Sequence, residues 1–314
     1  MKPLRTNKLR SGLSFARWLL AHQVRRRLPG LLGPDPIDRV DTSSVAHQFK
    51  INYCCKLDQP FHLEGGLRIR DLSYVEKTGY SFDIHRILAP FDELRFAYLP
   101  GDVTHVPEVP TLVKSRPIGE HNHNAVLLPL NTRRHFEFFD DPLAFEAKKS
   151  VLVWRGEVHQ PHRAQFMAAC AELPFCDLGT SRTSYASCQR WVKPWLTPQA
   201  QAQCKYLFVI EGNDVASNIR WAMNCNSLCF MRRPRYETWF GEGLLVPNEH
   251  YVEVADDFSD VEAKFAFYEA NPQEALAIIR RSQAFVRAQL DLTVQYALAR
   301  QVVHKYAHWS GATV

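Results

Sequence analysis

The second half of the chain alternates short apolar runs with longer stretches of helical spacing. The apolar runs have strand length and are rich in β-branched and aromatic residues. They predict strands at residues 151–154, 206–210 and 227–231, with further strand inside 244–254. The helical spacing predicts helices at residues 163–171, 217–224, 259–270, 272–289 and 293–309. Strands that alternate with helices indicate a parallel sheet with helices on both faces.

The first half of the chain is less regular. Residues 45–99 alternate short apolar runs, such as 67–69 and 96–99, with helix-like stretches, and this pattern indicates a first α/β domain. Residues 101–135 contain six prolines or glycines and several histidines, so we expect long functional loops there. With 314 residues, the chain is long enough for two domains.

Positive charge is concentrated at the N-terminus. The first 34 residues carry eight Lys or Arg side chains and no acid, so the overall net charge of +5 combines +8 here with −3 over the rest of the chain. A nucleic-acid-binding protein spreads basic residues over a face of its fold. We therefore predict no nucleic-acid partner.

Residues 1–34 are expected to form a basic helix or a pair of helices. Two interpretations stay open. Leucines and a tryptophan among basic residues suit the surface of an anionic membrane, which residues 1–30 would contact. Alternatively, a solvated helix packs on the body through its apolar side. The apolar run at 15–24 is too short and too charged to span a bilayer, and no signal-peptide pattern is visible.

The cysteine pattern favours free thiols. The eight cysteines are Cys54, Cys55, Cys170, Cys176, Cys188, Cys204, Cys225 and Cys229. None forms a Cys-x-x-Cys pair, and most lie in apolar stretches, where a thiol behaves as a small hydrophobe. This usage predicts a cytoplasmic protein, either free or peripheral on the cytoplasmic face of the inner membrane.

The best candidate for chemistry is the strand, loop and helix at 206–224. A glycine-containing loop around Gly212 follows the strand, and Arg220 falls in the first turn of the predicted helix. Ligands of parallel sheets bind beyond the carboxyl ends of the strands, and helix N-termini favour anions. Arg220 is therefore a candidate phosphate ligand. In the alternative interpretation, Gly212 only makes a turn and Arg220 is a surface residue.

A second strand end repeats this arrangement. Trp154-Arg155-Gly156 is followed by Pro161-His162-Arg163, so that a basic residue again opens a helix after a strand. Two arginines delivered by two such loops would clamp a diphosphate, because guanidinium gives two-pronged hydrogen bonds to phosphate oxygens and stays charged. Arginines near strand ends are common, so this loop alone is weak evidence.

A third candidate is Asp102, which follows the apolar run at 96–99. A carboxylate in this position is a candidate general base, although an Asx-turn or a helix cap is the commoner role. The histidines His105, His121, His123 and His135 have no acidic or cysteine partners at ligand spacing, so no metal site is predicted. Asp-x-Asp, Gly-x-Ser-x-Gly and Walker-type motifs do not occur in the sequence.

At these positions the sequence resembles glycosyltransferase family 90, over roughly residues 90–300. The resemblance is carried by Trp154-Arg155-Gly156 with Pro161 and Arg163, by 205–208, and by Val215-Ala216-Ser217-Asn218-Ile219-Arg220. Trp239-Phe240 and His250-Tyr251-Val252 follow in order. Several ordered motifs are far more specific than any one of them. The first 90 residues match poorly, so the resemblance says nothing about acceptor binding.

The resemblance implies an α/β protein of the GT-B type, with two Rossmann-like domains that face each other across a cleft. The expected parts are a basic helical segment at 1–34, an acceptor-side α/β domain at 35–148, a domain that binds a nucleotide sugar at 149–292, and a C-terminal helix at 293–314 that returns to the first domain.

The resemblance also implies an inverting mechanism that needs no metal or other cofactor. Asp102 resembles the family's catalytic base, and Arg163 and Arg220 resemble its donor-phosphate ligands. The implied donor-binding residues are Arg155, Gly156, Glu157, Arg163, Gly212, Asn213, Val215, Ala216, Ser217, Asn218 and Arg220. Glu157 stands where eukaryotic members have a small polar residue, so the identity of the sugar stays open.

The leading hypothesis is a transferase that moves a hexose, with glucose from UDP-glucose as first choice, onto a lipopolysaccharide core. Alternatives are another UDP-sugar such as xylose or galactose, another glycan acceptor, or a non-catalytic UDP-sugar-binding partner of an envelope-assembly complex. The UDP-sugar and the glycan are the expected partners.

Overall fold

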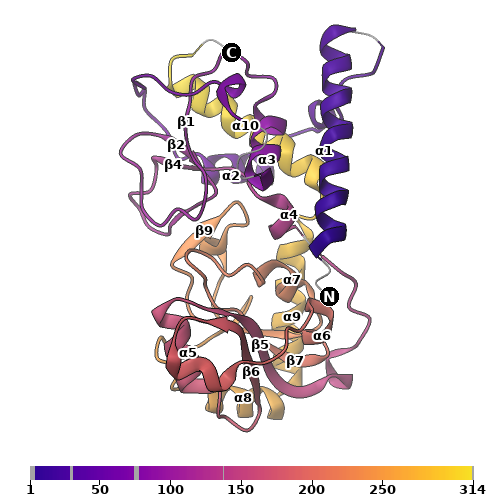
Figure 1. Ribbon diagram of the computed structural model, residues 1–314, viewed down its shortest axis with the longest axis vertical. Coiled ribbons are helices and arrows are strands. Elements are labelled where there is room, and N and C mark those ends of the chain that lie inside the picture. Colours follow the sequence, from indigo (N-terminus) through magenta and orange to yellow (C-terminus); the bar gives the residue numbers. More distant parts are fainter. Residues whose placement is uncertain (1–3, 29–30, 74–77, 137, 313–314) are drawn as a thin grey trace. The chain divides into compact units, whose positions relative to one another are not determined.

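The computed structural model describes residues 4–28, 31–73, 78–136 and 138–312, without the side chains of 4–12, 26 and 78. The chain divides into two compact units (Figure 1). The first unit comprises residues 1–134 and 291–314, and the second comprises residues 135–290. Each contains helices and a parallel sheet, which confirms the predicted α/β class.

The sheet of the first unit is small and parallel, with strand order β1-β2-β4. Its strands are β1 (Ala97–Leu99), β2 (Thr111–Val113) and β4 (Ala125–Leu127), and Thr111 is level with both Ala97 and Ala125. The expectation that residues 101–135 are long loops therefore holds only in part, because the strands β2, β3 (Ser115–Pro117) and β4 interrupt the loops at 101–110, 118–124 and 128–131. The apolar run at 67–69 gives only one antiparallel bridge, between Leu67 and Phe96.

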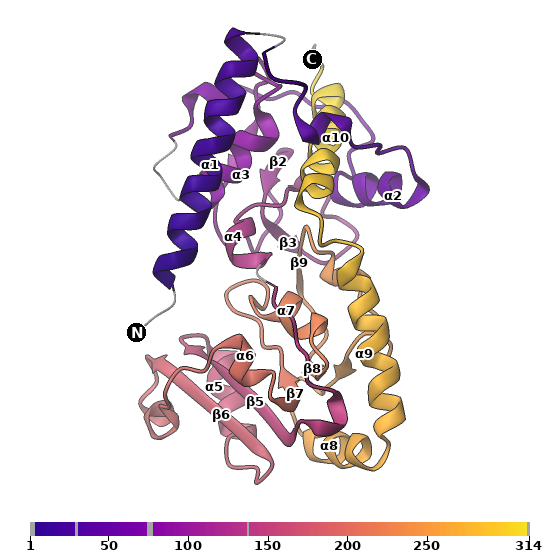
Figure 2. The same cartoon turned by 90° about the vertical axis from the view of Figure 1, so that its right-hand side faces the viewer.

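The helices of the first unit pack on one another. They are α1 (Leu4–Arg27), α2 (Val45–Cys54), α3 (Thr78–Leu88) and α10 (Leu292–Trp309), with 3-10 turns at Pro36–Arg39 and Ile69–Asp71. Helix α10 packs against α2 and α3, and α1 packs against α3. Within residues 4–28 the basic segment is one helix and not a pair. Figures 1 and 2 show α1 alongside α3, where the rings of Phe15 and Phe82 stack at 4.1 Å.

A buried carboxylate ties the last helix to the first unit. Asp83 of α3 accepts hydrogen bonds from the Tyr296 hydroxyl of α10 at 2.6 Å and from the backbone and hydroxyl of Thr132, both at 2.7 Å. Thr132 opens α4 (Thr132–His135), which spans the boundary between the units. These bonds satisfy a polar group that is costly to bury alone.

The second unit is built on a five-stranded sheet in which every pair is parallel, with order β10-β8-β7-β5-β6. The strands are β5 (Lys149–Val158), β6 (Cys176–Thr183), β7 (Cys204–Phe208), β8 (Leu228–Met231) and β10 (Val252–Glu253). The runs predicted at 151–154, 206–210, 227–231 and 244–254 all correspond to strands. Sequence patterning missed β6, which lies at an edge of the sheet.

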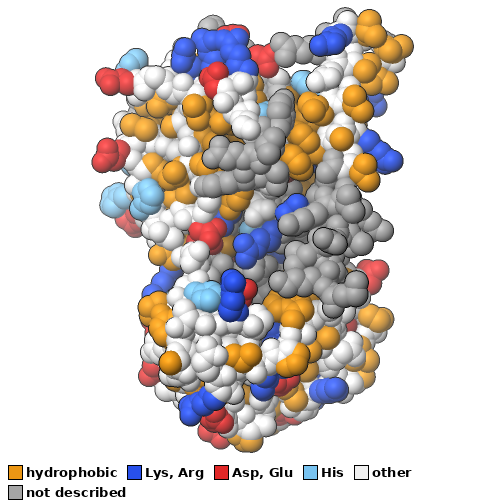
Figure 3. Space-filling model, in the orientation of Figure 1, with side chains coloured by type: hydrophobic (Ala, Val, Ile, Leu, Met, Phe, Trp, Pro, Cys, Tyr) orange, Lys and Arg blue, Asp and Glu red, His pale blue; other side chains and the backbone are white. Residues whose placement is uncertain are grey.

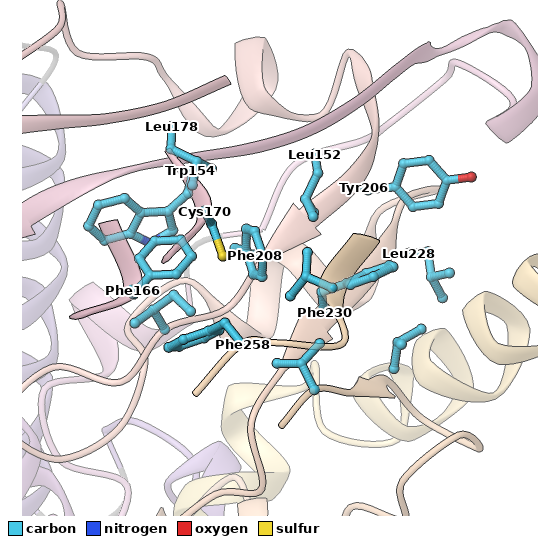
Figure 4. Close-up of a cluster of buried hydrophobic side chains, with 14 of the residues drawn as sticks. Leu152, Trp154, Phe166, Cys170, Leu178, Tyr206, Phe208, Leu228, Phe230 and Phe258 are labelled. Carbon is cyan, nitrogen blue, oxygen red and sulfur yellow. The ribbon is translucent and has the colours of Figure 1, made fainter. Parts of the chain in front are cut away.

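Helices cover this sheet and enclose an aromatic core. They are α5 (Pro161–Cys170), α6 (Pro198–Gln201), α7 (Ile219–Asn224), α8 (Val261–Ala270) and α9 (Pro272–Arg287), with 3-10 turns at Phe145–Ala147, Ala186–Trp191 and Glu242–Leu244, and β9 at Tyr236–Thr238. In the core, Phe166 of α5 packs edge-on against Trp154 and Phe208 (Figure 4). This packing holds α5 against β5 and β7.

Candidate active site

The carboxyl ends of three neighbouring strands bring the predicted residues of the second unit together. Because β5, β7 and β8 are parallel, the loops that follow them leave from the same edge of the sheet. Those loops are residues 159–160, 209–218 and 232–235. The arginine after β5 and the glycine loop after β7 therefore meet, as the strand-end pattern predicted.

Arg163 joins two of these loops. It lies in the first turn of α5, and its Nε and Nη2 donate to the carbonyls of Glu211 at 2.7 Å and Ile210 at 3.0 Å, after β7. Its Nη1 donates to the carbonyl of Glu157 in β5 at 2.7 Å. The guanidinium also lies over the ring of Trp154 at 5.4 Å. Arg163 thus places a positive charge at the strand ends and fixes the loop backbone around it.

The loop after β7 is folded tightly against this arginine. A Cβ on Gly212 would lie 3.5 Å from Nη2 of Arg163 and 3.5 Å from the carbonyl of Val215, which are ordinary van der Waals distances, so the packing around this loop does not itself require glycine. The side chain of Asn213 accepts from Gln160 at 2.8 Å, and Asn218 donates to the carbonyl of Phe208 at 2.9 Å. Of the remaining loop residues, Val215 and Ala216 are buried and Ser217 is half-buried.

Arg220 is a buried residue and not a surface one. Its side chain is 4% exposed, and it donates to the carbonyl of His135 at 3.0 Å and to the Thr238 hydroxyl at 3.1 Å. Thr238 in turn donates to the carboxylate of Glu242 at 3.0 Å. The ring of Phe136 lies 4.5 Å from the guanidinium. The helix α7 begins at Ile219, two residues later than predicted, and is only six residues long, so its dipole adds little.

Burial governs the electrostatics of this arginine. It lowers the pKa of Arg220 to about 10, and the nearby Glu242 opposes that shift, so Arg220 keeps its charge at neutral pH. Burial also raises the pKa of Glu242 against the influence of Arg220. The Nε–H of Arg220 is buried and has no hydrogen-bond partner in the part of the chain that the structure describes. An unpaired buried donor is costly, and a water, an ion or a ligand can satisfy it; the Nε–H groups of Arg68, Arg86 and Arg300 are buried and unpaired in the same way among the described residues.

Three residues at the end of β5 have neighbours within the sheet. Nη2 of Arg155 donates to both carboxylate oxygens of Asp177 in β6, each at 2.9 Å. Glu157 pairs with Arg182 of β6 at 3.1 Å. A Cβ on Gly156 would lie 2.4 Å from the indole of Trp154, so Gly156 lets that ring fold back into the core. These contacts hold β6 against β5 beside Arg163.

A hollow lies at the same edge of the second unit. Its walls come from the ends of β7 and β8, the following loops and the start of α7. They consist of Val209, Ile210, Glu211, Val215, Ala216, Ile219, Met231, Arg232, Pro234, Tyr236 and Glu242. Most of these residues are apolar, and the charged ones are Glu211, Arg232 and Glu242, of which Arg232 and Glu242 are buried. Burial raises the pKa of Glu211, which accepts from the backbone N–H of Arg235 at 2.9 Å.

In the first unit, Asp102 also follows the carboxyl end of a strand in a parallel sheet. It follows β1, and the ammonium of Lys114, which follows β2, donates to its carboxylate at 2.5 Å. The side chain of Lys114 is 3% exposed. Gly101 has a φ of 115°, a conformation that glycine readily adopts, and Ser115 binds both the N–H and the carbonyl of Val103. Asp102 is thus a carboxylate that an ion pair with a buried lysine holds in place.

Three further observations concern metal ions, membrane-spanning helices and disulfides. Among the described residues, no three His, Cys, Asp or Glu side chains form a cluster that would hold a metal ion. No described helix is long and apolar enough to cross a bilayer. The cysteines predicted to be free carry no disulfide in this structure.

Comparison with known proteins identifies the class. The family model described as "Glycosyl transferase family 90" matches residues 132–312, more than half of the chain. The chain is also 41% identical over 264 residues to "O-glucosyltransferase LpsA" of Dichelobacter nodosus, an alignment that covers 83% of each protein. The chain therefore belongs to glycosyltransferase family 90 and is a glycosyltransferase.

The family match bears differently on the candidate residues of the two units. The matched segment contains Arg163, Gly212 and Arg220, together with the sheet that carries them. It begins after Asp102 and Lys114, so the carboxylate rests on the geometry of the first unit and on the resemblance in sequence. Sequence reasoning missed Lys114, because a lysine after an apolar run resembles an ordinary exposed turn residue.

Proposed function

We propose that this glycosyltransferase transfers glucose from UDP-glucose to a hydroxyl of a lipopolysaccharide core, with inversion and without a metal ion. The observation that carries the donor assignment is the buried, charged Arg220, whose Nε–H is unpaired among the described residues. A phosphate oxygen would satisfy that donor. The named activity of the Dichelobacter nodosus relative supports glucose as the transferred sugar.

The proposed reaction is a single in-line displacement. The acceptor oxygen forms a bond to the anomeric carbon as the bond from that carbon to the UDP oxygen breaks. The proton of the acceptor hydroxyl passes to the carboxylate of Asp102, which Lys114 holds in place. The leaving diphosphate gains negative charge, and Arg163 and Arg220 stabilise it.

The remaining donor contacts are also proposals. The backbone at 215–218 and the side chain of Asn213 would contact the phosphates or the sugar, and the Gly212 turn would let the phosphates approach the chain. For Arg155, Gly156 and Glu157 we propose a supporting role, because their contacts hold β5 and β6 beside Arg163. We propose the GT-B arrangement for the two units, each of which has a parallel sheet.

A transfer assay in EDTA tests this proposal. Purified protein with UDP-glucose and a truncated core oligosaccharide should release UDP and lengthen the acceptor. Parallel reactions with UDP-galactose and UDP-xylose test the choice of sugar. A strict metal requirement would contradict the mechanism. Binding of UDP without transfer to any acceptor would favour the non-catalytic alternative.

A further inference from the structure

Helix α1 presents apolar side chains on two opposite faces. Leu13 and Leu20 are separated by two helical turns and share one face, and Phe15 and His22 share another in the same way. Because successive helical residues are about 100° apart around the axis, the two pairs lie on nearly opposite sides. Because both faces carry apolar side chains, hydrophobic periodicity alone does not show that the helix has two distinct faces.

The inner face is anchored to the first unit. Phe15 is 6% exposed and stacks on Phe82 of α3. Arg86 of α3 lies 5.9 Å from the ring of Phe15 and 5.8 Å from that of Trp18, and it donates to the hydroxyl of Ser14 at 3.1 Å. Contacts with α3 therefore cover this face of α1.

The outer face is open to solvent. Leu13 is 59% exposed and Leu20 is 63% exposed, and the exposed leucines Leu28 and Leu31 follow the end of the helix. Arg17 and Arg27 are exposed on the same side. Figure 3 shows hydrophobic side chains along this helix with basic ones between them. Large exposed leucines that share one face of a helix indicate a surface that binds something apolar.

The positive charge of the N-terminal segment indicates which kind of partner binds the outer face of α1. The first 34 residues carry +8 and no acid, so the outer face calls for an apolar surface that is also negatively charged. A second copy of the chain would bring the same positive segment and be repelled. We propose that the outer face of α1 docks on an anionic lipid bilayer, with leucines in the headgroup–acyl boundary and arginines at the phosphates. This docking does not depend on the donor chemistry.

The proposal unites the two interpretations that the sequence left open. The helix packs on the body through Phe15, and it keeps a second face for lipid. Binding to a membrane is then expected without rearrangement of the inner face.

Cosedimentation of the full-length protein with vesicles tests this surface. We expect binding to phosphatidylglycerol mixed with phosphatidylcholine, and little binding to phosphatidylcholine alone or at high salt. The double variant Leu13→Ser/Leu20→Ser should bind about tenfold more weakly, since two partly inserted leucines are lost. The double variant Arg17→Gln/Arg27→Gln should also lose about tenfold.

The matched control is Val45→Ser/Phe49→Ser, which removes two exposed apolar side chains from α2. Its vesicle binding should equal that of the unmodified protein. Unchanged binding of the Leu13→Ser/Leu20→Ser variant would overturn the proposal. So would self-association in the absence of lipid that this variant abolishes, because a second copy would then be the partner. Circular dichroism shows whether each variant is folded, and UDP affinity should not change in any of them.

Discussion

Arg220 combines a structural role with a proposed role in binding, and a single substitution would confuse the two. Its buried charge lies beside Glu242, which Thr238 links to it. Removal of one member of a buried charged pair leaves the other uncompensated. Loss of activity in Arg220→Ala alone would therefore say little about phosphate binding.

A pair of variants separates these roles. We expect Arg220→Met to lower the free energy of unfolding by about 3 kcal/mol, because the Glu242 carboxylate loses its counter-charge. Arg220→Met/Glu242→Gln should recover most of that loss. Both should bind UDP about tenfold to hundredfold more weakly, because a charge-assisted phosphate contact is gone. Denaturant unfolding and calorimetric titration give the two quantities.

The control for these variants is Arg280→Met, an exposed arginine of α9. It removes the same charge and should leave both stability and UDP affinity unchanged. Recovery of full UDP affinity in the double variant would contradict the assignment of Arg220 to the donor.

Lys114 offers a second test at the residue scale. Lys114→Met removes the ammonium that orients Asp102 and fills the buried space with a side chain of similar length. We expect kcat to fall at least about tenfold, since a positioned general base contributes about a hundredfold or more. UDP affinity should be unchanged, because both residues are in the first unit. A change confined to the donor KM would contradict this role.

The site illustrates what residue patterns reveal and what they conceal. The meeting of Arg163 with the Gly212 loop was predictable, because parallel strands end at a common edge. The sequence did not show that Arg220 is buried with Glu242 or that Lys114 is paired with Asp102. Burial of a charged side chain depends on contacts that are distant along the chain, and no local pattern records them.

At the scale of elements, the strength of the periodic signal decided which parts of the fold were predictable. The strands β5, β7 and β8 contain uninterrupted apolar runs and were found. The strand β6 contains Asp177, Gly179 and Arg182 and lies at an edge, so its pattern is broken. The strands β2 and β4 have only three residues each, among prolines that suggested loops.

The attachment of α10 to α3 predicts a pH dependence of stability. Burial raises the pKa of Asp83 to about 6 from 3.8, against hydrogen bonds from Tyr296 and Thr132 that lower it. The protonated native carboxyl therefore adds stability at low pH, which is lost as the pH rises through the folded pKa. The contribution of Asp83 to stability should fall by on the order of 3 kcal/mol between pH 3.8 and about 6, because each unit of pKa shift corresponds to about 1.4 kcal/mol.

Comparison of the unmodified protein with Asp83→Asn isolates this effect. The difference in their free energies of unfolding should change with pH between 3.8 and about 6 and be constant above it. Urea unfolding at a series of pH values measures the difference. A difference that does not vary with pH would contradict the raised pKa.

The two faces of α1 predict opposite responses to truncation. Phe15→Ala should lower the free energy of unfolding by about 3 kcal/mol, because it removes a buried ring that stacks on α3. Leu20→Ala, on the exposed face, should change it by less than about 0.5 kcal/mol. Thermal unfolding of the two variants compares them. Equal effects would show that the helix packs differently.

At the scale of the whole molecule, the proposed reaction uses residues from both units, each of which contains a parallel sheet. The second unit offers a cationic strand edge at Arg163 and Arg220, and the first offers the carboxylate of Asp102. Membership of family 90 establishes a glycosyltransferase. We propose that the second unit binds the donor and that the first unit supplies the base that removes the proton.

The most direct test is the rate of glucose transfer from UDP-glucose to a truncated core in EDTA, with UDP affinity measured on the same samples. We predict transfer by the unmodified protein, and for Asp102→Asn a loss of at least about a hundredfold in kcat with UDP affinity retained. Full activity of Asp102→Asn, or a loss of UDP affinity equal to its loss of activity, would contradict the claim.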